Sequence, residues 1–293
     1  MELNPEVLLL SLINQATTYS LGNELFVPFF LFFDIIYCII FMVINLRNIK
    51  IIIEYDGKKY FGWQRQPNKT TVQSEIEKAI YKVTGEEVVI YSSGRTDAGV
   101  CAYNQVANFK IKSDIDIKKI PLALNAHLKK SIIIKSAEEV DERFHSRYCC
   151  VGKKYMYIIN NSKYGSAINR EREFHMPKEL NIEDMKKALK FFEGTHDFKG
   201  FKSSGTSSKD TVRTIYEANL EYKDEKIYIT LHGNGFMYNM VRIIAGTIVD
   251  VGLGKIKKED IPDIIKSGVR KNAGKTLPAQ GLYLMEVYYW FYQ

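Results

Sequence analysis

The residues best able to do chemistry lie in one short segment, Ser93–Gly99, which reads SGRTDAG. An acid, Asp97, follows a base, Arg95, by two positions, and glycines stand on either side. Gly94 and Gly99 can adopt backbone angles closed to other residues, which lets a substrate approach closely. A carboxylate held there could attack a carbon centre or remove a proton. Composition alone favours a surface turn with a local ion pair, which contributes little. The string as a whole is too specific for such a turn.

A hydrophobic strand precedes this loop, so we expect a rigid element to hold it. Apolar spacing and turn residues predict the order β-α-β-β-α-β for the first half of the chain. The expected strands are Ile49–Tyr55, Val88–Ser92, Gln105–Ile111 and Ser131–Ala137; the expected helices are Thr70–Gly85, opening on a capping-box pattern at Thr70–Gln73, and Ile117–Leu128.

The second half echoes this order. Its expected elements are a strand at Lys153–Asn160, a helix capped by Asn181 and ended by Gly194, a hairpin of Val212–Tyr222 and Lys226–His232, a helix at Phe236–Val251 and a closing strand at Leu282–Trp290. We therefore predict an α+β fold of two split-βαβ (ferredoxin-like) halves, whose antiparallel sheets meet at a central cleft. The expected domains are residues 47–150 and 151–293.

The composition is that of a globular chain with a basic body. Of 293 residues, 46% are hydrophobic and 26% charged, which excludes a disordered, collagen-like or multi-span membrane protein. Residues 1–46 contain four acids and no Lys or Arg, so the rest carries 41 basic against 30 acidic side chains, a net charge of +11. A positive body favours an anionic partner, nucleic acid first.

The cysteines and histidines give no metal signature. No CxxC occurs, and none of the five histidines stands at zinc-ligand spacing from a cysteine. The four cysteines are Cys38, Cys101, Cys149 and Cys150. This pattern predicts a reduced, cytoplasmic protein without a structural metal.

The first 46 residues differ from the rest. Leu25–Ile44 is an apolar run, interrupted only by Pro28 and Asp34, that is long enough to cross a bilayer. No basic residue precedes it, as a secretory signal requires, and Asp34 would cost about 2.5–3.5 kcal/mol near a membrane centre. Translation from Met42 would still include the whole first strand. We expect residues 1–46 to be a dispensable hydrophobic extension; a membrane-tethered protein is the alternative, which cell fractionation would distinguish.

The segment Gly94–Val100 resembles the catalytic motif of the tRNA pseudouridine synthase A family. Seven further segments resemble that family in the same order, between about residues 48 and 287: EYDG at 54–57 with FGWQRQ at 61–66, VQ at 72–73, NAHL at 125–128, FHSR at 144–147, KKYMY at 153–157, FMYNMVR at 236–242 and PAQGLYL at 278–284. The chain departs from the family pattern at Cys101, where a histidine is usual, and at Ser146 and Leu277, where alanine is common.

The resemblance implies an isomerase that converts uridine to pseudouridine at positions 38 to 40 of the tRNA anticodon stem-loop. It implies tRNA as the partner, a homodimer with tRNA crossing both subunits, and an RNA-binding cleft between the halves. We expect no cofactor, because the reaction has neither a redox nor a phosphate-transfer step. The alternatives are a synthase of the same fold acting on another RNA position, and an RNA-binding protein that has lost catalysis.

The resemblance also assigns roles to residues. Asp97 would be the catalytic carboxylate, acting on the sugar or the base, and Arg242 the cation that keeps it ionised. Tyr155 would stack on the target uracil and reach a proton, Leu282 would pack against the same base, and Arg95 would help hold the nucleotide out of its stem. The candidates for phosphate contact are Lys58, Lys59, Arg65, Lys153 and Lys154.

Overall fold

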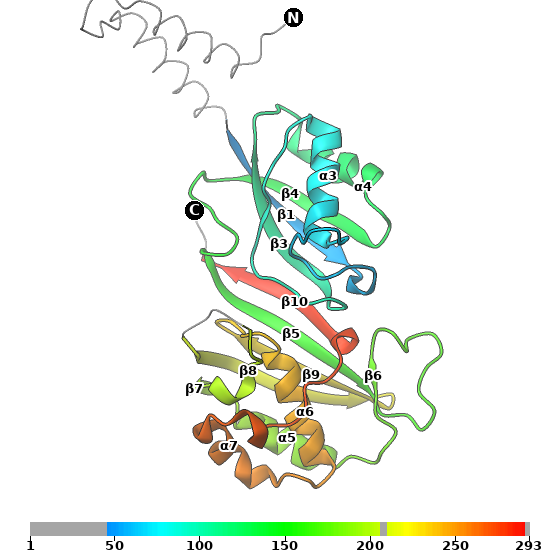
Figure 1. The fold of residues 1–293 in the computed structure, drawn as a ribbon, viewed down its shortest axis with the longest axis vertical. Helices are drawn as coiled ribbons and strands as arrows, with labels where there is room; N and C mark the ends of the chain where they lie inside the picture. Colours follow the sequence, from blue (N-terminus) through cyan, green and yellow to red (C-terminus); the bar gives the residue numbers. More distant parts are fainter. Residues whose placement is uncertain (1–45, 206–209, 291–293) are drawn as a thin grey trace, which may run out of the picture. The chain divides into compact units, whose positions relative to one another are not determined.

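The computed structural model describes residues 46–205 and 210–290 (Figure 1). The described residues from Asn48 onward, 48–205 and 210–290, form one compact unit. The apolar run Leu25–Ile44 and Met42 within it lie outside the described residues. Within the described ranges, no helix is long and apolar enough to cross a membrane.

A single sheet of ten strands runs through this unit. Its strand order is β4-β1-β3-β10-β5-β9-β8-β7, with the short β2 beside β3 and β6 beside β5. The strands are β1 (Arg47–Tyr55), β2 (Tyr91–Ser92), β3 (Cys101–Ile111), β4 (Ile132–Val140), β5 (Cys150–Asn160), β6 (Phe174–His175), β7 (Gly194–Asp197), β8 (Val212–Lys223), β9 (Lys226–Gly233) and β10 (Leu282–Tyr289).

The closing strand β10 joins the two halves of the chain. It pairs in parallel with β3 of the first half and antiparallel with β5 of the second (Figure 1). The α+β class is confirmed, but the two antiparallel sheets that we expected are one continuous mixed sheet. The physical reason is that β10 pairs with both β3 and β5, which would otherwise present unpaired edges at the middle of the molecule.

The helices cover the sheet in two groups. Helices α3 (Val72–Thr84) and α4 (Ile120–His127) pack on each other, and α4 packs on β4. Helices α5 (Ile182–Lys190) and α6 (Met240–Gly252) pack on each other and on β8 and β5, with α7 (Ile261–Ser267) close to β7. Alternate residues of β5, namely Tyr155, Tyr157 and Ile159, are buried, as expected for a strand with one covered face.

Several element ends differ from the predictions. The capping box of α3 is formed by Thr71 and Ser74, one residue later than expected. Gly85 ends the helix as predicted, and the structure shows it in the left-handed conformation. Helix α5 ends at Lys190, so Gly194 starts β7 instead of ending the helix. Of the expected strand 88–92, only Tyr91–Ser92 pairs with a neighbour. Apolar content alone does not reveal whether a partner strand lies alongside.

The start of α6 matters most for the site. The helix begins at Met240, because Asn239 adopts a left-handed conformation with φ of 63° and breaks the helical path. Residues 236–239, which we expected to be helical, form the approach to the helix instead. Arg242 consequently lies in the first turn of α6.

Candidate active site

The loop that carries Asp97 is clamped against the first half of the chain. The backbone N–H of Trp63 donates to the Thr96 carbonyl at 3.0 Å. Gly57 lies so close beneath the loop that a Cβ there would stand 1.9 Å from the Val100 carbonyl oxygen. Such tight backbone contacts hold the loop in one position relative to the first half of the chain, as a preorganised site requires.

A buried hydrogen-bond network supports the same loop from below. Gln105 of β3, which is fully buried, accepts a hydrogen bond from the Ser93 hydroxyl at 2.7 Å and donates to the Gly94 carbonyl at 3.0 Å. The Tyr55 hydroxyl of β1 shares a 2.7 Å hydrogen bond with the Thr96 hydroxyl. Satisfied buried networks of this kind fix one conformation, so side chains from two strands set the position of the loop.

The two glycines of the motif serve different purposes. Gly99 has φ of +84°, the left-handed conformation that we expected of it. Gly94 does not have the positive φ that we considered for it, and a Cβ there would lie 2.5 Å from Nζ at the flexible end of the Lys153 side chain. Gly99 therefore shapes the loop through its backbone angle, whereas Gly94 marks the close approach of the Lys153 side chain.

Asp97 and Arg242 meet although 145 residues separate them. Arg242 Nη1 lies 3.5 Å from Asp97 Oδ2, and their side chains are 16% and 33% exposed. Burial raises the pKa of the Asp97 carboxyl, and the charge of Arg242 opposes that rise without cancelling it. The expected pairing is present, but its effect differs from our expectation, because desolvation outweighs the neighbouring cation.

Arg242 is itself held firmly by other groups. Its Nε donates to the Leu277 carbonyl at 2.7 Å, and its Nη1 donates to Asn239 Oδ1 at 2.6 Å. The left-handed backbone of Asn239 directs that side chain, whose Nδ2 also donates to Ser203 Oγ at 2.9 Å. Two short hydrogen bonds therefore hold the guanidinium in place, with Nη1 also directed toward Asp97.

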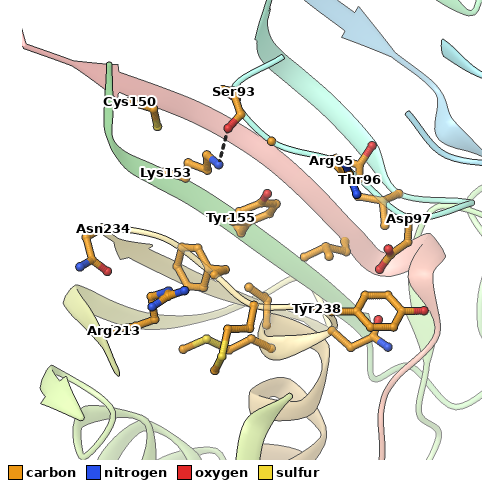
Figure 2. Close-up of a pocket in the computed structure, with 18 of the residues that line it drawn as sticks. Ser93, Arg95, Thr96, Asp97, Cys150, Lys153, Tyr155, Arg213, Asn234 and Tyr238 are labelled. Carbon is orange, nitrogen blue, oxygen red and sulfur yellow. Dashed lines mark hydrogen bonds between the residues drawn. The ribbon is translucent and has the colours of Figure 1, made fainter. Parts of the chain in front are cut away.

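Asp97 and Tyr155 line a cavity of about 870 Å³ (Figure 2). Leu282 also lines it. Tyr155 is 8% exposed and meets the ring of Phe236 edge-on at 5.2 Å. Burial raises the pKa of the Tyr155 phenol, so it stays protonated at neutral pH. Carboxylate, phenol and apolar surface in one cavity suit an aromatic base that must be stacked and chemically altered.

The two neighbouring lysines of β5 lie on opposite faces of the sheet, since successive strand residues alternate. Lys153 lines the cavity, and its Nζ donates to the Ser93 carbonyl at 2.7 Å (Figure 2). Lys154 pairs in register with Glu286 and His232 and is not among the residues that line the cavity. Of the two expected phosphate contacts, Lys153 alone therefore faces the candidate site.

The other predicted cations lie in different places. Arg95 is exposed and lines the cavity. Arg65 is exposed, 3.3 Å from Glu77, and does not line it. Lys58 forms an ion pair with Glu171, and Lys59 lines a second, smaller cavity beside Asp56 and Arg172.

Sequence reasoning missed several residues of the site. The cavity is also lined by Arg147, Arg213, Asn234 and Tyr238. Arg147 and Tyr238 stand inside two of the family-like segments, FHSR and FMYNMVR, which was the available signal. Arg213 and Asn234 lie in no such segment and become visible only because β8 and β9 bring them to the cavity. Among the described residues, no group of three or more His, Cys, Asp and Glu side chains could hold a metal ion.

Comparison with known proteins supplies the family. The model of the family described as tRNA pseudouridine synthase matches residues 51–149 and 188–290. The tRNA pseudouridine synthase A of Acetivibrio thermocellus is 51% identical over 244 residues, which cover 83% of this chain and 100% of that protein. The protein of the same name from Caldicellulosiruptor bescii is 52% identical over 244 residues, with the same coverage.

Among solved structures, a Cbf5–Nop10–Gar1 complex matches with a TM-score of 0.31 and 13% identity, over 80% of this chain and 57% of that chain. A match this weak supports no conclusion about the fold. The family model matches more than half of the chain, and both relatives align over their full length at more than 50% identity. The chain therefore belongs to the tRNA pseudouridine synthase A family.

Proposed function

We propose that this chain isomerises uridine to pseudouridine at positions 38 to 40 of the tRNA anticodon stem-loop. The observation that carries the proposal is the contact of Arg242 with Asp97, which lines a cavity together with Tyr155, in a member of this family. An RNA-binding protein without catalysis would have no use for a carboxylate held beside a preorganised guanidinium.

Asp97 is the catalytic carboxylate of the proposed reaction. The reaction breaks the N1–C1′ bond of uridine and joins C5 to C1′, so C5 must lose its proton and N1 of the product must carry one. A carboxylate can attack C1′, attack the base or remove a sugar proton, and each of these roles requires the ionised form. Arg242 stabilises that form against the burial that raises the pKa of Asp97.

Tyr155 and Leu282 hold the base. The buried phenol ring of Tyr155 offers a stacking surface, and its protonated hydroxyl lies in the cavity where the base would turn. Leu282 belongs to the closing strand β10 and lies two residues before Leu284, which pairs in register with Tyr155. Apolar contact from one side and an aromatic ring from another let a uracil rotate without leaving the site.

The target uridine lies in a stacked stem and must be extruded, which costs a few kcal/mol. Arg95, exposed at the mouth of the cavity, is suited to contact the strand from which the base leaves. Several adjacent target positions imply recognition of RNA shape instead of base identity. We further propose a homodimer with tRNA crossing both subunits, on the strength of the family resemblance.

The test uses tRNA transcripts tritiated at uridine C5. Conversion to pseudouridine releases the label into water, so we expect release from transcripts that carry uridine at position 38, 39 or 40. A matched transcript with cytidine at all three positions is the control. Release that persists from the control would favour a synthase acting elsewhere, and no release from any transcript would refute the catalytic proposal.

A further inference from the structure

The cavity has a second end, away from Asp97, that the proposed chemistry does not use. In Figure 2, Lys153, Arg213 and Asn234 lie on one side of Tyr155, and Asp97 and Tyr238 lie on the other. The cavity volume of about 870 Å³ is near the upper end of the ~300–1,000 Å³ typical of ligand sites. It can therefore hold more of an RNA strand than one extruded base.

The charges of this second end are unbalanced. The described residues that line the cavity include four cations and a single carboxylate, Asp97. Arg95 lies on the Asp97 side (Figure 2), so the second end has three cations: Lys153, Arg213 and Arg147, whose charge acts on Lys153. Asp97 sits at the opposite end, beside Arg242. Arg213 donates to the carboxylate and carbonyl of Asp210 and to the Val212 carbonyl. The Asp210 carboxylate is 74% exposed, so solvent screens its charge.

Among the cations that line the cavity, Lys153 is the most informative about the local charge. Its ammonium lies under the loop, donates to the Ser93 carbonyl, and has no salt bridge to a carboxylate in the described structure. Burial lowers the pKa of Lys153; the nearby Cys150 opposes that shift, and the charge of Arg147 adds to it. Gathering like charges at a half-buried site is unfavourable in the free protein, so an anionic ligand would relieve a strain that the fold otherwise carries.

The three cations line one cavity from separate elements. Lys153 comes from β5, Arg213 from β8, and Arg147 from the segment between β4 and β5. An arrangement assembled from three parts of the chain, beside the ring of Tyr155, has the charge and position to receive a backbone phosphate next to a base stacked on that ring.

We propose that Arg147, Lys153 and Arg213 form a binding site for the phosphodiester adjacent to the extruded uridine. This inference rests on the proposed function, and it adds a named anchor that holds the strand while the base turns. Two arginines can donate in pairs to phosphate oxygens, and the lysine supplies a third charge behind them. The site acts in binding and contributes no group to the bond changes at Asp97.

The experiment combines protein variants with a modified RNA. Arg147→Gln and Arg213→Gln are compared with Lys266→Gln, an exposed lysine on α7 that does not line the cavity. Each protein is given an anticodon stem-loop RNA with either a normal phosphodiester or an uncharged methylphosphonate beside the target uridine. The measurements are the dissociation constant across a salt series and the single-turnover rate at saturating RNA.

For each arginine variant, we expect affinity for normal RNA to fall about tenfold and the slope of log Kd against log salt to fall by about 1. The rate at saturation should change less than about twofold, because the chemistry lies at the other end of the cavity. The methylphosphonate should weaken wild-type binding similarly and cost the arginine variants little more, since both changes remove one contact. Lys266→Gln should match wild type.

Three results would overturn the site. They are arginine variants with wild-type affinity, losses from variant and methylphosphonate that simply add, and wild-type protein that ignores the methylphosphonate. The methylphosphonate test needs no altered protein, so it can refute the proposal even if an arginine variant fails to fold. Failure of the proposed function would look different, because wild-type protein would then release no tritium from unmodified tRNA.

Discussion

Replacing Arg242 by methionine tests the central pair of the site. The change removes the guanidinium 3.5 Å from Asp97 and keeps an unbranched side chain in the first turn of α6. At that distance two unit charges interact by about 1 kcal/mol in water and about 5 kcal/mol at an effective dielectric constant of ~20. Since Asp97 is 33% exposed, solvent screening places the value near the lower end, about 1–2 kcal/mol.

The direction of the change in rate follows from the pKa of the Asp97 carboxyl. Burial already raises the pKa of Asp97 and Arg242 opposes that rise, so removing Arg242 raises the pKa further. Less carboxylate is then ionised on the acid side of the rate profile. A loss of 1–2 kcal/mol corresponds to a rate about 5- to 30-fold lower there, with the acid limb displaced to higher pH.

The assay is single-turnover tritium release at saturating tRNA across a pH series, with tRNA binding measured in parallel. Arg242→Lys is the matched control, because it keeps a charge and loses the fork that reaches Asn239 and the Leu277 carbonyl. It should recover part of the acid limb. If Arg242→Met instead loses tRNA affinity while its rate profile stays unchanged, Arg242 belongs to the binding surface and our reasoning fails.

Four further outcomes are expected. Asp97→Asn should abolish tritium release with tRNA binding retained, and residual turnover above a few per cent would count against Asp97. Its free energy of unfolding should rise by less than about 1 kcal/mol at neutral pH, because folding raises the pKa of Asp97 and so penalises the ionised carboxylate. This gain in stability should vanish in acid, where the carboxyl is protonated in both states. Tyr55→Phe should cost about 1 kcal/mol of stability through the lost Thr96 hydrogen bond and lower the rate more than the affinity, whereas an unchanged rate would show that this network does not position the loop. Binding of tRNA should weaken steeply with salt, with a slope near −0.9 per duplex phosphate contact, and a flat dependence would contradict a basic binding surface. A chain beginning at Met42 should be dimeric and fully active by light scattering and tritium release, and misfolding would show that the preceding residues pack on the body.

Local sequence determined most of the elements and the identity of the reactive loop. The apolar spacing of residues 72–84 and the terminal Gly85 predict helix α3, and the run after residue 48 predicts β1, because these signals depend on neighbours within a few positions. The motif Gly94–Val100, read with the other family-like segments, led to Asp97, Tyr155 and Arg242. Its glycines also carried information about the backbone, since the left-handed angle of Gly99 is a local property.

Only the tertiary structure decided how these parts combine. No local signal reveals that β10 pairs with both β3 and β5, because strand pairing depends on contacts between residues far apart in the chain. Strand register separates Lys153 from Lys154, two lysines that sequence treats alike. The direction of the Asp97 pKa depended on burial as well as on Arg242, and burial is set by everything that surrounds the loop. The place of Arg213 at the cavity also depends on the folded structure. Its charge is evident from the sequence, but its neighbours are set only when the chain folds.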